Sequence, residues 1–479
     1  MELIFEISKP GKKGVKLPLK DVPAECRLDA GYKRSADAEL PSISEPEVIR
    51  HFTRMAGMNF NVDANFYPLG SCTMKYNPKF TEKIAAFEEF VSLHPLQAQL
   101  APGAALTQGA LEIISNLEQA LCEIAGMDAF TTQPMAGAHG ELTGVMLIAA
   151  YHRHKGNKKK YVLIPDSGHG TNPASAAIAG YEVKTVPTGP DGVMDIDAFR
   201  KKLGPDTAAV MLTCPNTLGI FNPHIREICD LAHAAGALMY NDGANLNAIL
   251  GKARPGDLGF DVVHVNLHKT FATPHGGGGP GSGPVGVKSE LAPFLPIPRI
   301  VKKKAAFVLE FDRPQSIGYI SPFYGNFGVM LKAYAYILLL GKDGLTEVSE
   351  NAVLNACYLK KCLMEHYDVP YDRNCLHEFV VSAARQAKKG VRAMDIAKAL
   401  IDSGIHPPTV YFPLIVKEAM MIEPTETESK ETLDRFIEVM TRLARLAEKD
   451  PGAFKKFPKN APIHRPDEAK AARDMNVSA

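Results

Sequence analysis

Apolar, strand-like segments alternate with helix-like segments between about residues 104 and 287, and this alternation restricts the fold more than any other sequence feature. The strand-like segments read TTQ, YVLIP, YEVKTVP, AAVMLT, ALMYN and DVVHVN. Such alternation predicts an α/β fold in which helices cover both faces of a mostly parallel sheet. Ligands of these sheets bind beyond the carboxyl ends of the strands. We therefore expect the functional residues in the turns that follow the strands.

The chain has 479 residues, and single hydrophobic cores stop growing at about 250–300 residues, so we expect two or three packing units. Residues 1–100 are irregular and rich in proline and charge, with one helix expected over 78–93, and they predict an N-terminal wrapping arm. Residues 101–325 form the predicted large domain, with prolines over 288–313 marking a crossover between domains. Residues 326–479 predict a smaller C-terminal α+β domain with an extended tail, in which helical patterns cover 325–340 and 344–367.

Composition limits the classes of partner. The chain is 46% hydrophobic and 22% charged, and its net charge of +1 generates no field that attracts nucleic acid or an anionic membrane, so a small substrate is expected. Eight cysteines without a CxxC pair favour reduced thiols and no metal site. The N-terminus shows no targeting signal, and no apolar run approaches the roughly 20 residues of a membrane span. We expect a soluble, cytoplasmic protein.

A single lysine, Lys269, follows the apolar strand DVVHVN and precedes a run of glycines. An amine among small and apolar residues is poorly solvated, loses its proton more readily, and becomes a nucleophile toward carbonyl groups. The glycines indicate a close approach of the backbone. They satisfy G-x-G-x-x-G from Gly281 onward, but no helix follows and the lysine precedes them, so both kinds of nucleotide loop are excluded.

Three further features follow other strands. Asp242 ends the strand ALMYN, where a carboxylate suits a protonated pyridine nitrogen, and Asn245 lies three residues later. The turn Ala138–His139–Gly140 opens a helix and suits a phosphate, and His169 suits stacking on a planar ring. Taken singly, each has an ordinary structural explanation, such as a helix cap or a solvated lysine. Along the chain, the phosphate turn, the stacking ring, the carboxylate and the lysine follow successive strands in that order, and together they predict a pyridoxal 5′-phosphate site.

The sequence also resembles glycine decarboxylase, the P-protein of the glycine cleavage system, over about residues 45–465. The matching motifs are YPLGSCTMKYNPK, QPMAGAHGELTG, DSGHGTNPASA, NLHKTFATPHGGGGPGSGP, FYGNFG and PPTVYFPLIVKEAMMIEPTETESK. The resemblance implies a fold-type I pyridoxal-phosphate fold, with 101–325 as the cofactor-binding domain.

The resemblance also implies roles for individual residues. Lys269 would bind the cofactor covalently, Asp242 would contact the pyridine nitrogen, and His169 would stack on the ring. The 138–140 turn would bind the phosphate. Further cofactor contacts are expected from Asn245, Asn266 and His268. We take His275, six residues after the lysine, as the candidate catalytic acid or base.

The resemblance implies the reaction and the partners as well. Glycine would be decarboxylated, and its aminomethyl group would pass to the lipoyl disulfide of H-protein. The length resembles the second, lysine-bearing subunit of the two-subunit form, which implies a first subunit and a heterotetramer of two subunit types.

Two other functions stay open on the sequence alone. One is another fold-type I enzyme, an aminotransferase or a desulfurase, that needs no lipoyl partner. Against these, no arginine clamp for a substrate carboxylate is recognisable, and Cys357, Cys362 and Cys375 lie in helix-like or domain-start segments rather than a mobile loop. The other is a scaffold subunit without catalytic activity.

Overall fold

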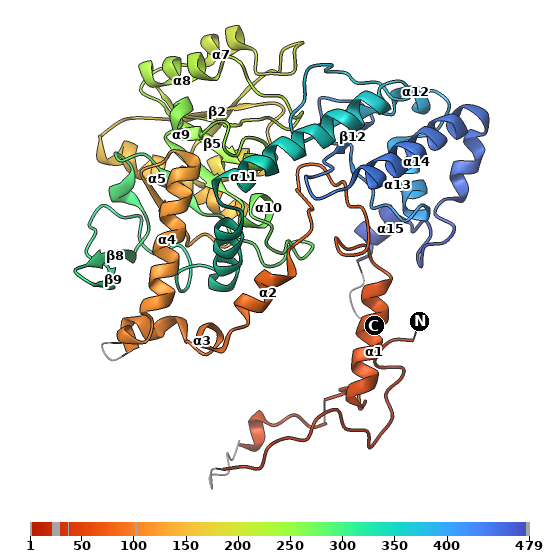
Figure 1. The fold of residues 1–479 in the computed structure, drawn as a ribbon, viewed down its shortest axis with the longest axis horizontal. Helices are drawn as coiled ribbons and strands as arrows, with labels where there is room; N and C mark the ends of the chain where they lie inside the picture. Colours follow the sequence, from red (N-terminus) through yellow and green to blue (C-terminus); the bar gives the residue numbers. More distant parts are fainter. Residues whose placement is uncertain (1, 22–28, 37, 101–102, 476–479) are drawn as a thin grey trace. The chain divides into compact units, whose positions relative to one another are not determined.

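The computed structural model shown in Figure 1 describes residues 2–21, 29–36, 38–100 and 103–475. Contacts divide the chain into two compact units. The first comprises Met1–Asn61 with Ala461–Ile463 and contains η1 (Ala30–Tyr32) and α1 (Glu45–Gly57). Helix α1 begins with a capping box, in which the Glu47 carboxylate accepts a hydrogen bond from the Ser44 N–H at 2.9 Å. The second unit, Val62–Asn460 with His464–Ala479, contains every predicted site residue.

A seven-stranded sheet forms the centre of the second unit, with strand order β1-β7-β6-β5-β4-β2-β3. Neighbouring strands from β6 to β3 are parallel, whereas β7 is antiparallel to both β6 and β1. The strands are β1 (Ala129–Thr131), β2 (Tyr161–Pro165), β3 (Glu182–Val186), β4 (Thr207–Thr213), β5 (Leu238–Gly243), β6 (Val262–Val265) and β7 (Val285–Val287). The mostly parallel sheet predicted from the sequence is confirmed.

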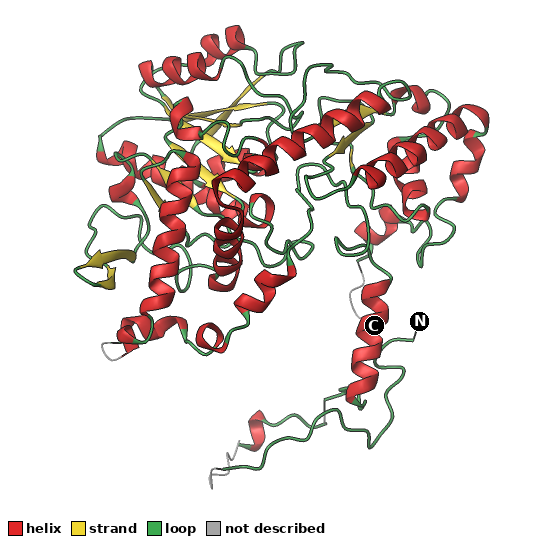
Figure 2. Ribbon diagram, in the orientation of Figure 1, coloured by secondary structure: helices red, strands yellow, loops and turns green. Residues whose placement is uncertain are grey.

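Helices cover both faces of this sheet (Figure 2). In β4, Ala209 and Met211 pack into the core that includes residues of α5 (Gly137–His154), whereas Val210 and Leu212 pack into the core that includes residues of α4 (Gln108–Ala125) and α8 (Ile225–Ala234). Alternate residues of a strand point to opposite faces, so a strand buried on both sides has a continuous apolar sequence. β4 is accordingly buried at all seven of its residues.

Shorter elements complete the large sheet's surroundings. They are α2 (Lys79–Ala85), α3 (Glu88–Val91), η2 (Pro95–Gln99), η3 (Gly103–Ala105), α6 (Thr171–Ile178), α7 (Ile196–Lys202), η4 (Leu246–Ala248), α9 (Pro255–Leu258), α10 (Leu267–Thr270) and η5 (Ala292–Phe294). The single helix expected over 78–93 is wrong, because α2 ends at Ala85 and α3 begins at Glu88. The stretch 288–313, expected as a crossover, contains the hairpin of β8 (Arg299–Lys303) and β9 (Ala306–Glu310).

The C-terminal part of the chain contains a second, smaller sheet, which is antiparallel and has the strand order β10-β12-β11. Its strands are β10 (Phe379–Ser382), β11 (Thr409–Val410) and β12 (Ala419–Ile422), and the helices are α11 (Phe327–Leu363), α12 (Ala384–Ala387), α13 (Ala393–Asp402), α14 (Lys430–Lys449), η6 (Pro451–Lys456) and α15 (Glu468–Arg473). Helix α11 is interrupted at Gly341, whose φ of 60° and ψ of −166° are not helical. This break separates the two helical patterns predicted over 325–340 and 344–367.

Helix α11 also joins the two cores, because Met330 packs with the large sheet and Leu359 packs with the small sheet. The domain boundaries at residues 100 and 325 stay a prediction. Cys72, Cys122, Cys214, Cys229, Cys357, Cys362 and Cys375 are free thiols, and Cys26 lies outside the described residues. Within the described ranges, none of the helices combines the length and apolar character that crossing a membrane would require.

Candidate active site

A cavity lies where the parallel strands β2, β4, β5 and β6 reach their carboxyl ends. Its walls are formed by Ser71, Gly137, Ala138, Glu141, His169, Thr171, Thr213, Thr217, Asp242, Ala244, Asn245, Asn266, His268 and Lys269. Seven of the predicted site residues are therefore brought together: Ala138, His169, Asp242, Asn245, Asn266, His268 and Lys269. His139, Gly140 and His275 are not among the lining residues.

Lys269 lies on α10, a single helical turn that follows β6. The turn is anchored by Leu267, which is fully buried in the main core. The half-buried Lys269 side chain extends from it into the cavity, and Nζ donates a hydrogen bond to the Ser71 carbonyl at 2.8 Å. A fixed strand and a buried anchor thus position Lys269, which is the only lysine among the described residues that line this cavity.

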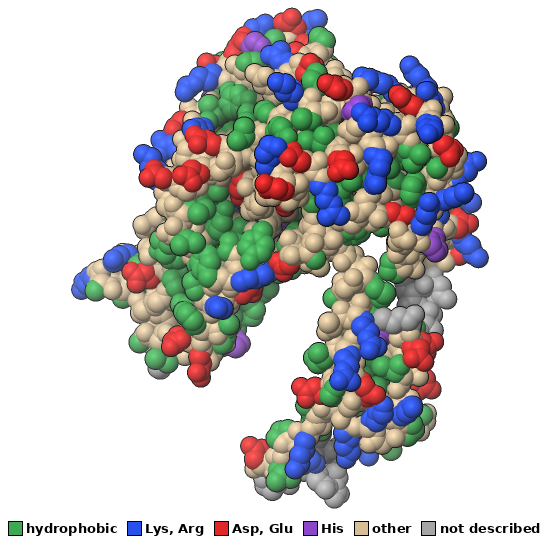
Figure 3. Space-filling model, turned by 45° about the vertical axis from the view of Figure 1, so that its right-hand side comes forward, with side chains coloured by type: hydrophobic (Ala, Val, Ile, Leu, Met, Phe, Trp, Pro, Cys, Tyr) green, Lys and Arg blue, Asp and Glu red, His purple; other side chains and the backbone are tan. Residues whose placement is uncertain are grey.

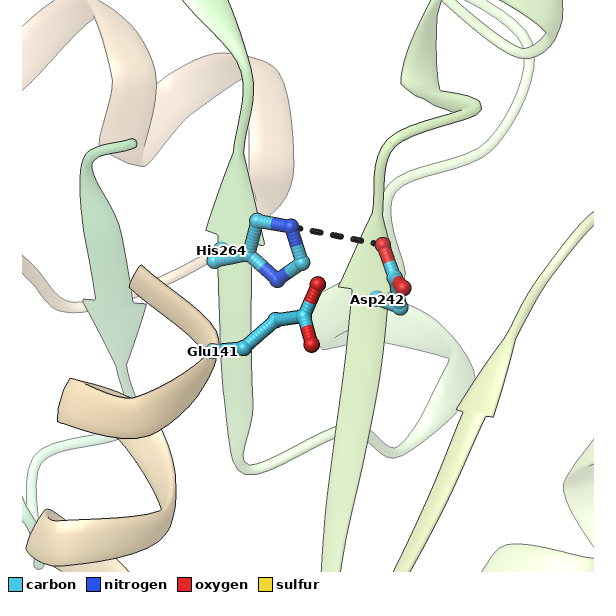
Figure 4. A group of neighbouring side chains, drawn as sticks. All are labelled: Glu141, Asp242 and His264. Carbon is cyan, nitrogen blue, oxygen red and sulfur yellow. Dashed lines mark ion pairs between the residues drawn. The ribbon is translucent and has the colours of Figure 1, made fainter. Parts of the chain in front are cut away.

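Asp242, His264 and Glu141 form a buried group beside the lysine (Figure 4). Asp242 on β5 pairs with His264 on β6 in the strand register, and His264 Nε2 lies 3.3 Å from the Asp242 carboxylate. The other ring nitrogen of His264 lies 2.9 Å from the Tyr240 hydroxyl. When that hydroxyl donates to Nδ1, the proton of the neutral ring is on Nε2, which faces the carboxylate.

The amide of Asn172 connects the two carboxyl groups, because Nδ2 donates to Glu141 at 3.0 Å and to Asp242 at 3.0 Å. Burial would raise the pKa of Asp242, but His264, the Asn172 amide and Lys269 outweigh it and hold that pKa below its ordinary value. Burial and the Asp242 charge raise the pKa of Glu141 to about 7. Asp242 is therefore the ionised member of the pair, whereas Glu141 is protonated below neutral pH and loses its proton near pH 7.

The turn that precedes α5 differs in detail from the predicted phosphate cup. A Cβ atom at Gly137 would lie 2.6 Å from Asn266 Oδ1, so a larger residue there would require the Asn266 side chain to move. The Gly140 N–H already donates to the Ala136 carbonyl at 2.9 Å, and His139 Nδ1 accepts from the Met135 N–H at 3.2 Å. The first turn of the helix, from Gly137 onward, presents the N–H groups that have no partner within a helix.

The other predicted contacts have defined neighbours. His169 Nδ1 lies 2.9 Å from the Thr171 hydroxyl, and Asn245 Nδ2 donates to the Pro215 carbonyl at 3.0 Å. His268 Nδ1 accepts from the Ser282 N–H at 3.3 Å, and burial with the nearby Lys269 charge lowers the His268 pKa to about 3. His268 is therefore neutral and fixed in one orientation.

His275 lies on the loop that carries Gly276 to Gly279, and its ring centroid is 5.6 Å from that of His268. Burial, and to a lesser extent Lys269, lower the pKa of His275. A neutral imidazole accepts a proton, so the half-buried ring has the protonation state of a base. Its catalytic role stays a prediction.

Known proteins match this chain over most of its length. The family described as "Glycine cleavage system P-protein" matches residues 15–305, and "Glycine dehydrogenase, C-terminal domain" matches residues 348–461. A protein of Listeria innocua named "Probable glycine dehydrogenase (decarboxylating) subunit 2" is 56% identical over 99% of this chain and 97% of its own length. A Caldanaerobacter subterraneus protein of the same name is 55% identical over 98% of this chain and 97% of its own length. The chain belongs to the glycine cleavage system P-protein family.

Solved structures show the same fold as this P-protein family member. A glycine decarboxylase (P-protein) in inhibitor-bound form superposes with a TM-score of 0.71 at 22% identity, covering 86% of this chain and 92% of that one. A glutamate decarboxylase of Lactobacillus brevis superposes with a TM-score of 0.68 at 13% identity, covering 94% of this chain and 98% of that one. The predicted fold class and the predicted resemblance are confirmed.

The residues of this P-protein cavity fit pyridoxal 5′-phosphate. Thr213 Oγ1 and Asn266 Oδ1 are buried without a hydrogen-bond partner among the described residues, although both line the cavity. Buried polar atoms are normally hydrogen-bonded, so such atoms indicate a polar ligand. An amine, a carboxylate and a helix N-terminus around them match the aldehyde, the ring nitrogen and the phosphate of that cofactor.

Four residues that complete the site have no predicted site role from the sequence: Ser71, Glu141, Asn172 and His264. Asn172 and His264 lie within or beside the recognised motifs, where Asn172 suits a helix cap. Glu141 is one helical turn after Gly137, a spacing that places the two on the same face of α5. Ser71 comes from a segment about 200 residues earlier, and no local pattern connects it with Lys269.

The protonated state of Glu141 predicts a pH effect on stability. Its pKa in the folded protein, about 7, exceeds the ordinary value of 4.5, so the folded state binds the extra proton and loses stability as pH rises between these values. Replacing Glu141 by glutamine should remove this loss. Relative to the parent protein, the free energy of unfolding of Glu141→Gln should increase by on the order of 2 kcal/mol between pH 5 and pH 8. Urea unfolding of both cofactor-free proteins at the two pH values tests this. If the stability difference between variant and parent is the same at pH 5 and pH 8, the prediction is contradicted.

Proposed function

We propose that this chain is the lysine-bearing subunit of a two-subunit, pyridoxal-phosphate-dependent glycine decarboxylase that transfers an aminomethyl group to lipoylated H-protein. Glycine loses its carboxyl group as carbon dioxide. The aminomethyl remainder forms a bond to one sulfur of the lipoyl disulfide, and the other sulfur becomes a thiol. The observation that carries the proposal is the convergence of Lys269 and Asp242 on one cavity in a member of this family.

When bound, pyridoxal 5′-phosphate supplies an electron sink for the electron pair that decarboxylation leaves on the glycine α-carbon. Lys269 would hold the cofactor covalently and take up the released amine proton. Asp242, ionised and held by Asn172 and Ala244 N–H groups, would keep a proton on the ring nitrogen. His169 would lie against the ring face, the first turn of α5 would bind the phosphate, and Asn245, Asn266 and His268 would orient the ring substituents.

Two partners belong to the proposal: a first subunit and H-protein. Hydrophobic side chains gather on one face of the second unit in the space-filling view (Figure 3). Large hydrophobic residues that are exposed in the described structure include Phe87, Val91, Leu338 and Leu339. Apolar patches on soluble proteins mark interaction surfaces, which supports assembly with a first subunit into a heterotetramer in the cytoplasm.

Exchange of labelled carbon dioxide into the glycine carboxyl group tests the proposed function. We expect exchange only when the chain is combined with pyridoxal 5′-phosphate and the first subunit, and we expect lipoylated H-protein to increase the rate. Borohydride should fix the cofactor on Lys269. Exchange that does not respond to H-protein would favour a fold-type I enzyme without a lipoyl partner. A chain that binds no cofactor would favour the scaffold function.

The proposed role of His275 makes a separate prediction. A general acid or base contributes about 10²- to 10⁴-fold to a rate, so His275→Ala should lower carbon dioxide exchange by a factor in that range while cofactor binding persists. His154 is an exposed histidine near the end of α5, and His154→Ala provides the matched control with unchanged exchange. Near-normal exchange by the His275 variant would remove this residue from the mechanism.

A further inference from the structure

Two buried carboxyl groups lie opposite each other at the ends of two neighbouring strands of the small sheet. Glu378 immediately precedes β10 and Glu423 immediately follows β12, and the register pairs Phe379 with Ile422, so the two glutamates are the next residues of that antiparallel pair. Both side chains are completely buried, and their carboxylate oxygens lie within 4.8 Å of one another. Like charges in directly opposed positions of a sheet repel, so this arrangement needs an explanation.

Both glutamates accept hydrogen bonds from one short segment, residues 71–73, which we call the 71–73 loop. The Ser71 N–H donates to Glu378 at 2.7 Å, and the Thr73 N–H donates to Glu423 at 3.0 Å. Ser71 and Thr73 have φ values of 65° and 47°, in the left-handed region that residues other than glycine rarely adopt. Such a backbone persists only when its surroundings fix it, and the two carboxyl groups supply the fixed acceptors.

The 71–73 loop connects the small sheet with the reactive lysine. Its Ser71 carbonyl accepts the hydrogen bond from Lys269 Nζ at 2.8 Å. Two residues after the loop, the buried Lys75 Nζ donates to the Thr270 carbonyl at 2.9 Å and pairs with Glu426 at 2.6 Å. The loop is therefore fixed by carboxyl groups on one side and by contacts to both Lys269 and its neighbour on the other.

We propose that Glu378 and Glu423 form a proton-sharing carboxyl pair that holds the 71–73 loop and thereby positions the Lys269 amine. They are positioning residues, because they act on the lysine through the Ser71 backbone. The proposal rests on the proposed function only in taking Lys269 as the reactive lysine.

The surroundings of the pair support a shared proton. Burial, and then the other carboxyl group, raise the pKa of Glu378 well above its ordinary value, and burial also raises the pKa of Glu423. Lys269 opposes both increases, and Lys75 opposes that of Glu423. The other groups that face the pair are the His377 ring, the Cys72 thiol and the Asn245 amide. Because the folded state holds the proton, loss of that proton at higher pH should loosen the loop.

Hydrogen–deuterium exchange on the cofactor-free full chain tests the pair without relying on activity. We expect Glu378→Ala and Glu423→Ala to accelerate exchange in the peptide covering residues 67–76 by at least about tenfold, with β4 unchanged. Glu418 provides the matched control, because its carboxylate accepts from the Ala393 N–H at 2.8 Å beside the opposite end of β12. Glu418→Ala should leave the 67–76 peptide as in the parent protein. Unchanged exchange in both alanine variants would overturn the proposal.

Glutamine variants test the shared proton and also serve if the alanine variants do not fold. In the parent protein, exchange of the 67–76 peptide, corrected for intrinsic rates, should rise with pH. In Glu378→Gln, one partner is always uncharged, so this rise should disappear; a rise equal to that of the parent would overturn the proton-sharing pair.

Capture of pyridoxal 5′-phosphate by the free protein, trapped with borohydride, should slow severalfold in the alanine variants. If the trapped label is not on Lys269, the proposed function fails. The hydrogen–deuterium exchange results still decide whether the two glutamates hold the 71–73 loop.

Discussion

Replacing Lys269 by alanine should abolish carbon dioxide exchange, with a loss of at least about 10³-fold, because no other amine lines the cavity in the described part of the chain. After borohydride treatment and dialysis under denaturing conditions, the variant should also retain no covalently attached cofactor, whereas the parent protein should retain it on Lys269. The proposed contacts to the phosphate, the ring face and the ring nitrogen do not involve this side chain, so we expect the variant still to bind pyridoxal 5′-phosphate reversibly. Absorbance spectra and radiolabelled carbon dioxide exchange measure the two effects separately.

Chemical rescue distinguishes a lost nucleophile from a damaged fold. A small primary amine such as methylamine enters a cavity from which a lysine side chain has been removed and replaces the missing group, so it should restore part of the exchange. Lys288→Ala is the matched control, since Lys288 Nζ donates to the Gly126 carbonyl at 2.6 Å and does not line the cavity. Full activity of Lys269→Ala without added amine would contradict the assignment.

Much of this site could be predicted because its main residues can be recognised from short segments of the sequence. Asp242 and Lys269 each stand at the end of an apolar strand, and parallel neighbours bring their carboxyl ends to the same edge. The glycine run after Lys269 predicts a close approach of the backbone, and the structure shows one at Gly283, where a Cβ atom would lie 2.1 Å from the Ala136 carbonyl oxygen. These local features, with the family resemblance for Asn266 and His268, predicted seven residues that line the one cavity, and the roles of these residues stay a prediction.

The rest could not be predicted because it depends on contacts between distant segments. Glu378 and Glu423 lie 45 positions apart and meet only through the register of the small sheet, which the sequence does not specify. Ser71 reaches Lys269 from a segment with no regular secondary structure. The pattern over 78–93 was interpreted as one helix because its apolar spacing continues through the turn at Ala86, where the helix nevertheless ends.

Asp242→Asn should lower carbon dioxide exchange by about 10²- to 10³-fold while leaving the cofactor attached to Lys269, since fixed charges of this kind commonly contribute that much. Asparagine keeps the shape and can still accept from the Ala244 N–H, which donates to Asp242 at 3.0 Å. It lacks the negative charge that would hold a proton on the ring nitrogen. The expected change is therefore a lower turnover with a similar affinity for glycine.

A cofactor analogue methylated on its ring nitrogen tests this cause, because its positive charge is permanent and needs no carboxylate to retain a proton. The analogue should recover part of the exchange in Asp242→Asn and add nothing to the parent protein. Asp261→Asn is the matched control: Asp261 also accepts from a backbone N–H, that of Met239 at 2.7 Å, but it lies outside the cavity. If the analogue fails while the variant keeps its fold and cofactor, Asp242 acts by orienting neighbouring groups such as Asn172 and His264 rather than by its charge.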